Sequence, residues 1–230
     1  MNSGLFLSLF LAHLVGDFYL QTGKHCEQKE TRKFKSVFLY IHAIIIGMLS
    51  WIMVPSWSFG LWTLIILGSH FIIDVIKIHF NKGLWSFVID QLFHLSILVA
   101  VSVIYEFPRE LPIQMIEYSG SFSTPLLILA VLLCIKPANI LIKLILEKYQ
   151  IGELKSCNTI KNAGPLIGNL ERMLTIIFVL LGRYEAIGFI IAAKSILRFK
   201  DTDTAKTEYV LAGTFLSFGI AILCGLMATI

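Results

Sequence analysis

The residues best suited to chemistry are histidines and aspartates that stand inside long apolar stretches. Three His/Asp pairs share a spacing of four residues, and a fourth histidine stands alone on the apolar stretch between two of them. The pairs are His13/Asp17, His70/Asp74 and Asp90/His94, and the lone residue is His42. Side chains four residues apart lie on the same face of a helix, so each pair offers two ligand atoms in one direction. Imidazole and carboxylate suit zinc, and two histidines with one carboxylate also suit iron or manganese.

This residue set predicts a divalent transition metal, with zinc as the first expectation and one or two ions present. The expected ligands are His13, His42, His70, Asp74 and His94. A carboxylate left outside the metal's ligands, Asp17 or Asp90, would act as general base on a metal-activated water. The alternative is a set of His–Asp hydrogen bonds that holds helices together without any metal.

The composition indicates that these residues lie in a membrane. The chain has 230 residues, of which 57% are hydrophobic and 15% charged, and its mean hydropathy is +0.80. A soluble domain carries about 25% charged residues. This excludes a disordered chain and a disulfide scaffold, and a net charge of +4 is too small to favour nucleic acid as a partner.

Eight apolar stretches are candidates for the helices that position the His and Asp residues, since a span needs about 20 mostly apolar residues. They cover 3–21, 36–54, 59–77, 84–105, 122–146, 164–182, 186–199 and 207–229. The expected fold is therefore all-α, a polytopic transmembrane bundle of seven or eight helices, because 186–199 is short for a full crossing. We expect 1–105 to form the His/Asp half and 106–230 a C-terminal half of the same membrane domain. The first stretch has no basic start or cleavage site, so we expect a retained helix rather than a signal peptide.

Loop charges predict the orientation. The loops 22–35 and 143–163 are rich in lysine, whereas 106–121 is acidic, so the lysine-rich loops should be cytoplasmic. All seven His and Asp residues then lie within about ten residues of a cytoplasmic helix end, about 15 Å at most along a helix axis. Four helices would thus bring them to one depth, and the repeated His/Asp pattern indicates two related hairpins.

The C-terminal half carries charges of its own. Arg172 follows Glu171 inside one span, and Lys194 and Arg198 share a face of the short stretch. One interpretation is a set of buried ion pairs with Glu171 and Glu208. The other is that Arg172, Lys194 and Arg198 bind the phosphate of a lipid substrate.

The sequence resembles an uncharacterised bacterial membrane family, known only as a domain of unknown function, at the motifs AHLVGDFYLQ, SHFIIDVIK and DQLFH. Two later stretches resemble the second half of its longer members, GNLERMLTIIFVLLGRYEAIGFIIAAKSILRF and EYVLAGTFLSFGIAIL. The HxxxD helices are also similar to those of bacterial proteins labelled membrane-bound metal-dependent hydrolases. The resemblance implies as site residues His13, Asp17, His70, Asp74, Asp90 and His94. It implies no particular substrate.

Three functions fit these observations. The leading hypothesis is a multi-pass protein of the bacterial cytoplasmic membrane that hydrolyses a lipid or lipid-linked substrate near the cytoplasmic leaflet with a bound metal. The second is a transporter or channel for divalent cations or protons. The third is a non-catalytic structural protein. The oligomeric state stays open, a homo-oligomer included.

Overall fold

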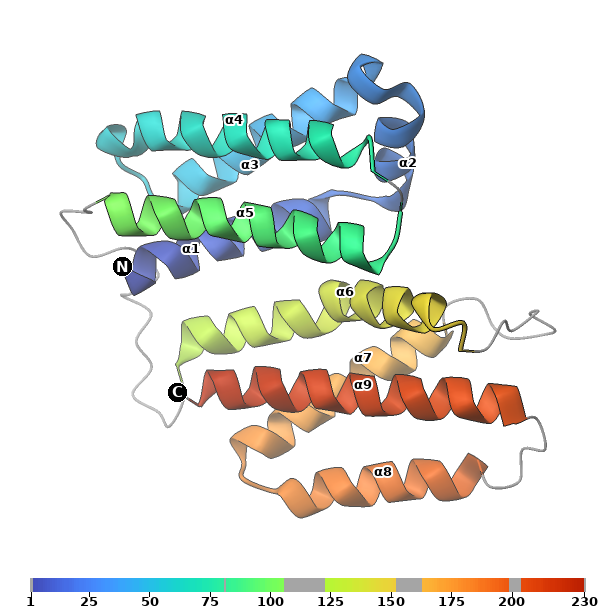
Figure 1. Cartoon of the computed structure of the whole chain (residues 1–230). Helices are drawn as coiled ribbons and strands as arrows, with labels where there is room; N and C mark the ends of the chain where they lie inside the picture. Colours follow the sequence, from blue (N-terminus) through green and yellow to red (C-terminus); the bar gives the residue numbers. More distant parts are fainter. Residues whose placement is uncertain (1, 81, 106–122, 152–162, 199–203, 230) are drawn as a thin grey trace. The chain divides into compact units, whose positions relative to one another are not determined.

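The protein is helical throughout the part that the structure describes. The computed structural model describes residues 2–80, 82–105, 123–151, 163–198 and 204–229, and these contain nine α-helices and no strand (Figure 1). The chain divides into two compact units, Met1–Glu117 and Tyr118–Ile230. The prediction of an all-α protein is confirmed.

The helix bounds follow the predicted apolar stretches closely. Unit 1 holds α1 (Ser3–Leu14), the π-helical turn η1 (Val15–Leu20), α2 (Gly23–Arg32), the 3₁₀ turn η2 (Lys33–Lys35), α3 (Val37–Met53), the 3₁₀ turn η3 (Trp57–Phe59), α4 (Gly60–Lys77) and α5 (Leu84–Ile104). Unit 2 holds α6 (Thr124–Lys148), α7 (Ala163–Leu180), α8 (Tyr184–Arg198) and α9 (Thr204–Ala228). The helix absent from the prediction is α2, which lies where a loop was expected. It is strongly polar, and a capping box between Thr22 and His25 begins it.

Five of the described helical segments are long and apolar enough to cross a membrane. They are Ser3–Leu20, Trp57–Lys77, Leu84–Ile104, Thr124–Lys148 and Thr207–Ala228. Large apolar side chains also cover the outside of both units; Trp57, Phe189 and Leu223 are each more than two-thirds exposed. Exposed apolar surface on this scale is typical of a protein whose solvent is lipid.

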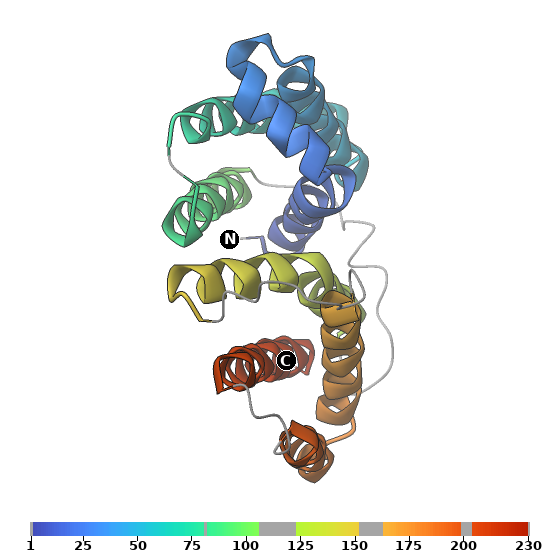
Figure 2. The same cartoon turned by 90° about the vertical axis from the view of Figure 1, so that its right-hand side faces the viewer.

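In unit 1 four helices close into a ring. Helix α3 packs against α1 and α4, and α5 packs against α4 and α1 (Figure 2). The apolar core of the ring includes Leu5, Leu9 and Ile46. The chain after α1 approaches α3 closely at Gly16, where a Cβ atom would lie 2.1 Å from Ile46 Cδ1. Any larger residue here would force the Ile46 side chain to shift, so Gly16 lets the chain after α1 pack closely against α3.

In unit 2 helix α9 packs against both α6 and α7, and α8 contacts α7 and α9 (Figure 1). Small residues of α9 lie at these contacts: Ala221 is fully buried, and a Cβ on Gly225 would lie 2.9 Å from Val179 of α7. The buried Cys134 and Cys224 belong to the apolar core of this unit.

Candidate metal centre

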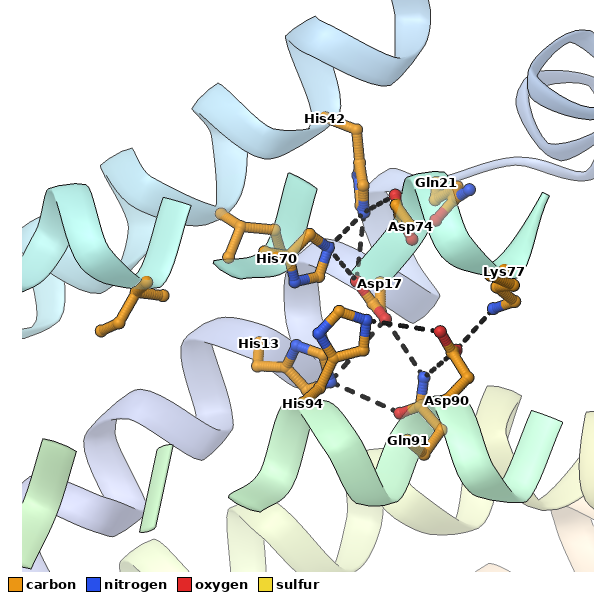
Figure 3. A network of polar contacts seen from close by, with 12 residues as sticks. His13, Asp17, Gln21, His42, His70, Asp74, Lys77, Asp90, Gln91 and His94 are labelled. Carbon is orange, nitrogen blue, oxygen red and sulfur yellow. Dashed lines mark hydrogen bonds and ion pairs between the residues drawn. The ribbon is translucent and has the colours of Figure 1, made fainter. Parts of the chain in front are cut away.

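The structure brings the seven predicted His and Asp residues together inside unit 1 (Figure 3). We call them the His–Asp cluster: His13 of α1, Asp17 of η1, His42 of α3, His70 and Asp74 of α4, and Asp90 and His94 of α5. Six of them are buried, and the side chain of Asp17 is 10% exposed. The cluster fills the middle of the ring of α1, α3, α4 and α5.

The π-helical turn η1 positions Asp17. Helix α1 ends after His13, and the chain continues through Val15–Leu20 with the wider π hydrogen-bonding pattern. His13 Nε2 and Asp17 Oδ2 are 3.7 Å apart. Single π turns inside α-helices are rare and frequently occur at functional sites. Because Gly16 fixes this turn against α3, Asp17 lies beside His42 of that helix.

Three ligand atoms form a tight triangle at the centre of the cluster. His42 Nε2 lies 3.1 Å from Asp17 Oδ1 and 3.1 Å from His70 Nε2. His70 Nε2 lies 3.3 Å from the same Asp17 oxygen. Ligands about 2.0–2.1 Å from a tetrahedral zinc ion are separated from one another by about 3.3 Å. The triangle therefore has the dimensions of one face of a zinc coordination sphere.

Hydrogen bonds alone do not satisfy this triangle. If both Nε2 atoms carry a proton, both donate to Asp17 but two N–H groups face each other at 3.1 Å. If only one carries a proton, the lone pair of the other faces the carboxylate oxygen. With neutral imidazoles, every assignment of tautomers leaves at least one repulsive contact. A cation at the centre makes all three contacts favourable.

Three buried ligand atoms of the cluster lack a hydrogen bond within the described part of the chain. Among the described residues, Asp90 Oδ1, His94 Nε2 and His42 Nδ1 have no hydrogen bond. The first two lie 3.5 Å apart. Two further groups have ligand atoms close enough for one ion, Asp74 with Asp90 and His94, and His13 with His70 and His94. Beside His13, His70 and His94 is a cavity of about 10 Å³, which is close to the space of one water.

Two lysines that were not predicted as site residues pair with the carboxylates. Lys29 Nζ lies 2.6 Å from Asp74 Oδ2, and Lys77 Nζ lies 2.5 Å from Asp90 Oδ2. Lys29 is buried although it comes from the polar helix α2. Three carboxylates, including Asp17, thus face two ammonium groups. With neutral imidazoles the cluster and its two lysines carry a net charge of −1, which favours a bound cation.

Gln91 is a further member of the network that was not predicted. Its amide nitrogen donates to Asp17 Oδ2 and to Asp90 Oδ2, each at 3.2 Å, and its oxygen lies 3.4 Å from His13 Nε2. It therefore connects the two carboxylates through one side chain. The available signal was an amide next to Asp90 in an apolar helix.

The charged residues predicted as a phosphate clamp lie in unit 2. Arg172 is buried, and Lys194 Nζ lies 2.7 Å from each oxygen of Glu171. Lys194 therefore forms the ion pair with Glu171 that the first interpretation expected. Arg198 ends α8, but its side chain lies outside the described residues.

The family comparison covers the unit that holds the cluster. A family model described as "Protein of unknown function (DUF3307)" matches residues 5–119, half of the chain. This range contains all seven residues of the His–Asp cluster, together with Lys29, Lys77 and Gln91. No match was found to a curated protein or to a solved structure. The chain belongs to the DUF3307 family, whose function is unknown.

Proposed function

We propose that the protein is an integral membrane protein that binds a divalent transition metal ion, zinc first, through Asp17, His42 and His70. The observation that carries this proposal is the triangle of ligand atoms, with sides of 3.1, 3.1 and 3.3 Å. Its size suits an ion, and its hydrogen bonding is unfavourable without one. The net charge of −1 on the His–Asp cluster and its two lysines also favours a bound cation.

The membrane location rests on the long apolar helices and the exposed apolar side chains. With lysine-rich loops in the cytoplasm, the cluster lies in the cytoplasmic half of the bilayer. We place the protein in the bacterial cytoplasmic membrane. Substrates within reach at that depth are lipids and lipid-linked molecules.

The reaction that we propose is metal-dependent hydrolysis. Three protein ligands with a free fourth position are typical of catalytic zinc sites, whereas structural sites use four protein ligands. The 10 Å³ cavity beside His70 has room for the attacking water. A bound metal would acidify that water and polarise the ester or phosphoester.

The geometry favours Asp90 over Asp17 as general base. Asp17 Oδ1 belongs to the triangle, whereas Asp90 Oδ1 has no hydrogen-bond partner among the described residues. Gln91 donates to both carboxylates and so fixes Asp90 relative to Asp17. His13 and His94 lie around the cavity, where they would orient the water.

A transporter of divalent cations is the second candidate, and one observation favours it. His70 and His94 each belong to two of the three groups that could hold an ion. Overlapping positions of this kind would let an ion pass from one group to the next. Uptake of zinc or manganese into proteoliposomes, abolished in Asp90→Asn, would favour transport over hydrolysis.

The test of metal binding is elemental analysis of the purified full chain beside three variants. We expect about one transition metal ion per chain in the wild type, as in single-ion zinc sites, and almost none in Asp17→Asn and His70→Ala. His79→Ala is the matched control, because His79 is exposed and its Nδ1 contacts the Val75 carbonyl of its own helix end. Equal metal content in all four proteins, or no metal in the wild type after reconstitution with zinc, manganese and iron, would refute the proposal.

Hydrolysis is tested separately with Asp90→Asn. We expect this variant to keep its metal and to lose turnover of a fluorogenic phospholipid or ester substrate by about 10²–10⁴-fold, the usual contribution of a general base. A metal-loaded wild type with no turnover on a panel of such lipids, combined with cation uptake, would replace the hydrolase by the transporter.

A further inference from the structure

Unit 2 contains a cavity of about 440 Å³ that the metal centre does not use. All four helices of the unit line it. The lining residues belong to the C-terminal half of α6, to the N-terminal halves of α7 and α9, and, on α8, to Lys194 near the end of the helix. Its volume is in the range of small-molecule sites.

Arg172 is the central polar residue of this cavity, and its charge is not balanced by a carboxylate. It is 1% exposed. Its guanidinium donates to four neutral acceptors, the Cys134 carbonyl, Asn139 Oδ1, Asn169 Oδ1 and Ser217 Oγ. Among the described residues no carboxylate lies within ion-pair distance of it, since Glu171 pairs with Lys194 instead. A buried cation without a counter-ion is costly, and an anion in the cavity would compensate it.

Glycines keep the space beside Arg172 open. A Cβ on Gly168 would lie 3.1 Å from Arg172 Nη1. Gly164 and Gly213 also line the cavity. The space is therefore formed by absent side chains on two helices, next to the charged group.

The other residues that line the cavity indicate the chemistry of the ligand beyond its anionic group. Ile140, Leu146, Ile167 and Val210 give it an apolar side. Lys143 also lines it, but its ammonium group lies 3.6 Å from Glu147 Oε1, so Arg172 is the cation without a carboxylate partner among the described residues. From these features we propose that the cavity of unit 2 binds an amphiphile with an anionic, phosphate-type headgroup, with the headgroup at Arg172 and the acyl part along the apolar wall.

The phosphate chemistry has two sources, a lipid headgroup and free phosphate. The ends of α6 and α7 beside the cavity connect through the lysine-rich segment 143–163, which faces the cytoplasmic leaflet in the orientation proposed above. The lipid source would be an anionic phospholipid of that leaflet. This proposal needs no metal and stands if the metal centre of unit 1 does not.

The direct variant, Arg172→Gln, removes bonds between α7 and the helices α6 and α9, so a loss of binding in this variant would not be distinguished from a loss of folding. Gly213→Leu is the better variant, because it fills the cavity without touching the Arg172 bonds; a Cβ at Gly213 meets only Leu146 Cδ1 at 3.8 Å. Gly219→Leu, on the same helix with open space around it, is the matched control.

The experiment measures the thermal unfolding midpoint and binding of the full chain in detergent micelles. The probes are dioleoyl phosphatidylglycerol, dioleoyl phosphatidylcholine and inorganic phosphate. We expect phosphatidylglycerol to raise the midpoint of the wild type and of Gly219→Leu, and to bind Gly213→Leu at least about tenfold more weakly. Phosphatidylcholine should have a much smaller effect.

The outcomes distinguish a lipid ligand from free phosphate, and both from a cavity that binds neither. Stabilisation by phosphatidylglycerol alone assigns the site to lipid, and stabilisation by inorganic phosphate, lost in Gly213→Leu, assigns it to free phosphate. The proposal is overturned if Gly213→Leu, folded with the same lipid-free midpoint as Gly219→Leu, binds phosphatidylglycerol and phosphate as the wild type does. It is equally overturned if no probe stabilises the wild type.

Discussion

Replacing Lys29 by methionine should tighten metal binding and at the same time weaken the metal-free protein. Lys29 Nζ lies 2.6 Å from Asp74 Oδ2, and that oxygen lies 3.9 Å from His42 Nε2 of the triangle. The ammonium group thus repels a cation in the triangle from close range. Methionine keeps much of the side-chain volume and removes the charge, so the net charge of the cluster and its lysines changes from −1 to −2.

The size of the effect follows from Coulomb's law. At a separation of about 6 Å and an effective dielectric constant of about 20, a unit charge and a divalent cation repel by about 5 kcal/mol. Relaxation and solvent reduce this, and we expect the metal dissociation constant to fall at least about tenfold, or 1.4 kcal/mol. Without metal, Asp74 loses its buried partner, which lowers the free energy of unfolding by about 3–5 kcal/mol.

The assay titrates metal-free protein in detergent with zinc against a chromophoric chelator, and follows thermal unfolding with and without zinc. Lys35→Met, a change of the same type at an exposed lysine, is the control and should leave both quantities unchanged. A dissociation constant for Lys29→Met that equals or exceeds the wild-type value, in protein that is folded with zinc, would refute the placement of the ion at the triangle.

Three other predictions test separate parts of the structure. Gly16→Ala places a Cβ against Ile46 of α3. This overpacking should lower the free energy of unfolding, measured by denaturant titration, by about 1–3 kcal/mol. It should also reduce metal content, because Asp17 moves. EDTA should lower the unfolding midpoint of the wild type but not of His70→Ala, because an ion at 100 times its dissociation constant stabilises by about 2.7 kcal/mol; equal shifts would show that the chelator acts elsewhere. Arg172→Lys offers three donors to four acceptors, so at least one buried acceptor loses its bond at a cost of about 1–3 kcal/mol, which chemical denaturation would detect; an unchanged midpoint would contradict the described bonding.

The helices of the fold could be predicted because their apolar residues are continuous. Each of the eight expected stretches has its helix in the structure, with ends displaced by a few residues. Helix α2 was not predicted because its surface is polar; the features that support it are the capping box at Thr22 and the ion pair of Lys29 with Asp74. Apolar periodicity carries no information about a helix of this kind.

The clustering of the His and Asp side chains could be predicted from the sequence, because four expected helices place them at the same depth in the membrane. The detailed geometry did not follow, because it depends on a local departure from the α-helix. The four-residue spacing of His13 and Asp17 assumed regular helix, whereas η1 has a π pattern. The pairing of Lys77 with Asp90 was not predicted either, because a lysine at the end of an apolar helix can equally extend its side chain to the membrane interface.

The glycine contact at the π turn has a consequence for the energetics of ion capture. Asp17, His42 and His70 come from three segments whose backbones are already locked together by Gly16, Ile46 and the ring of helices. Their ligand atoms lie 3.1–3.3 Å apart, so a metal at the proposed site would cost little conformational entropy on binding. Charge and dehydration would then set the affinity of such a preorganised site.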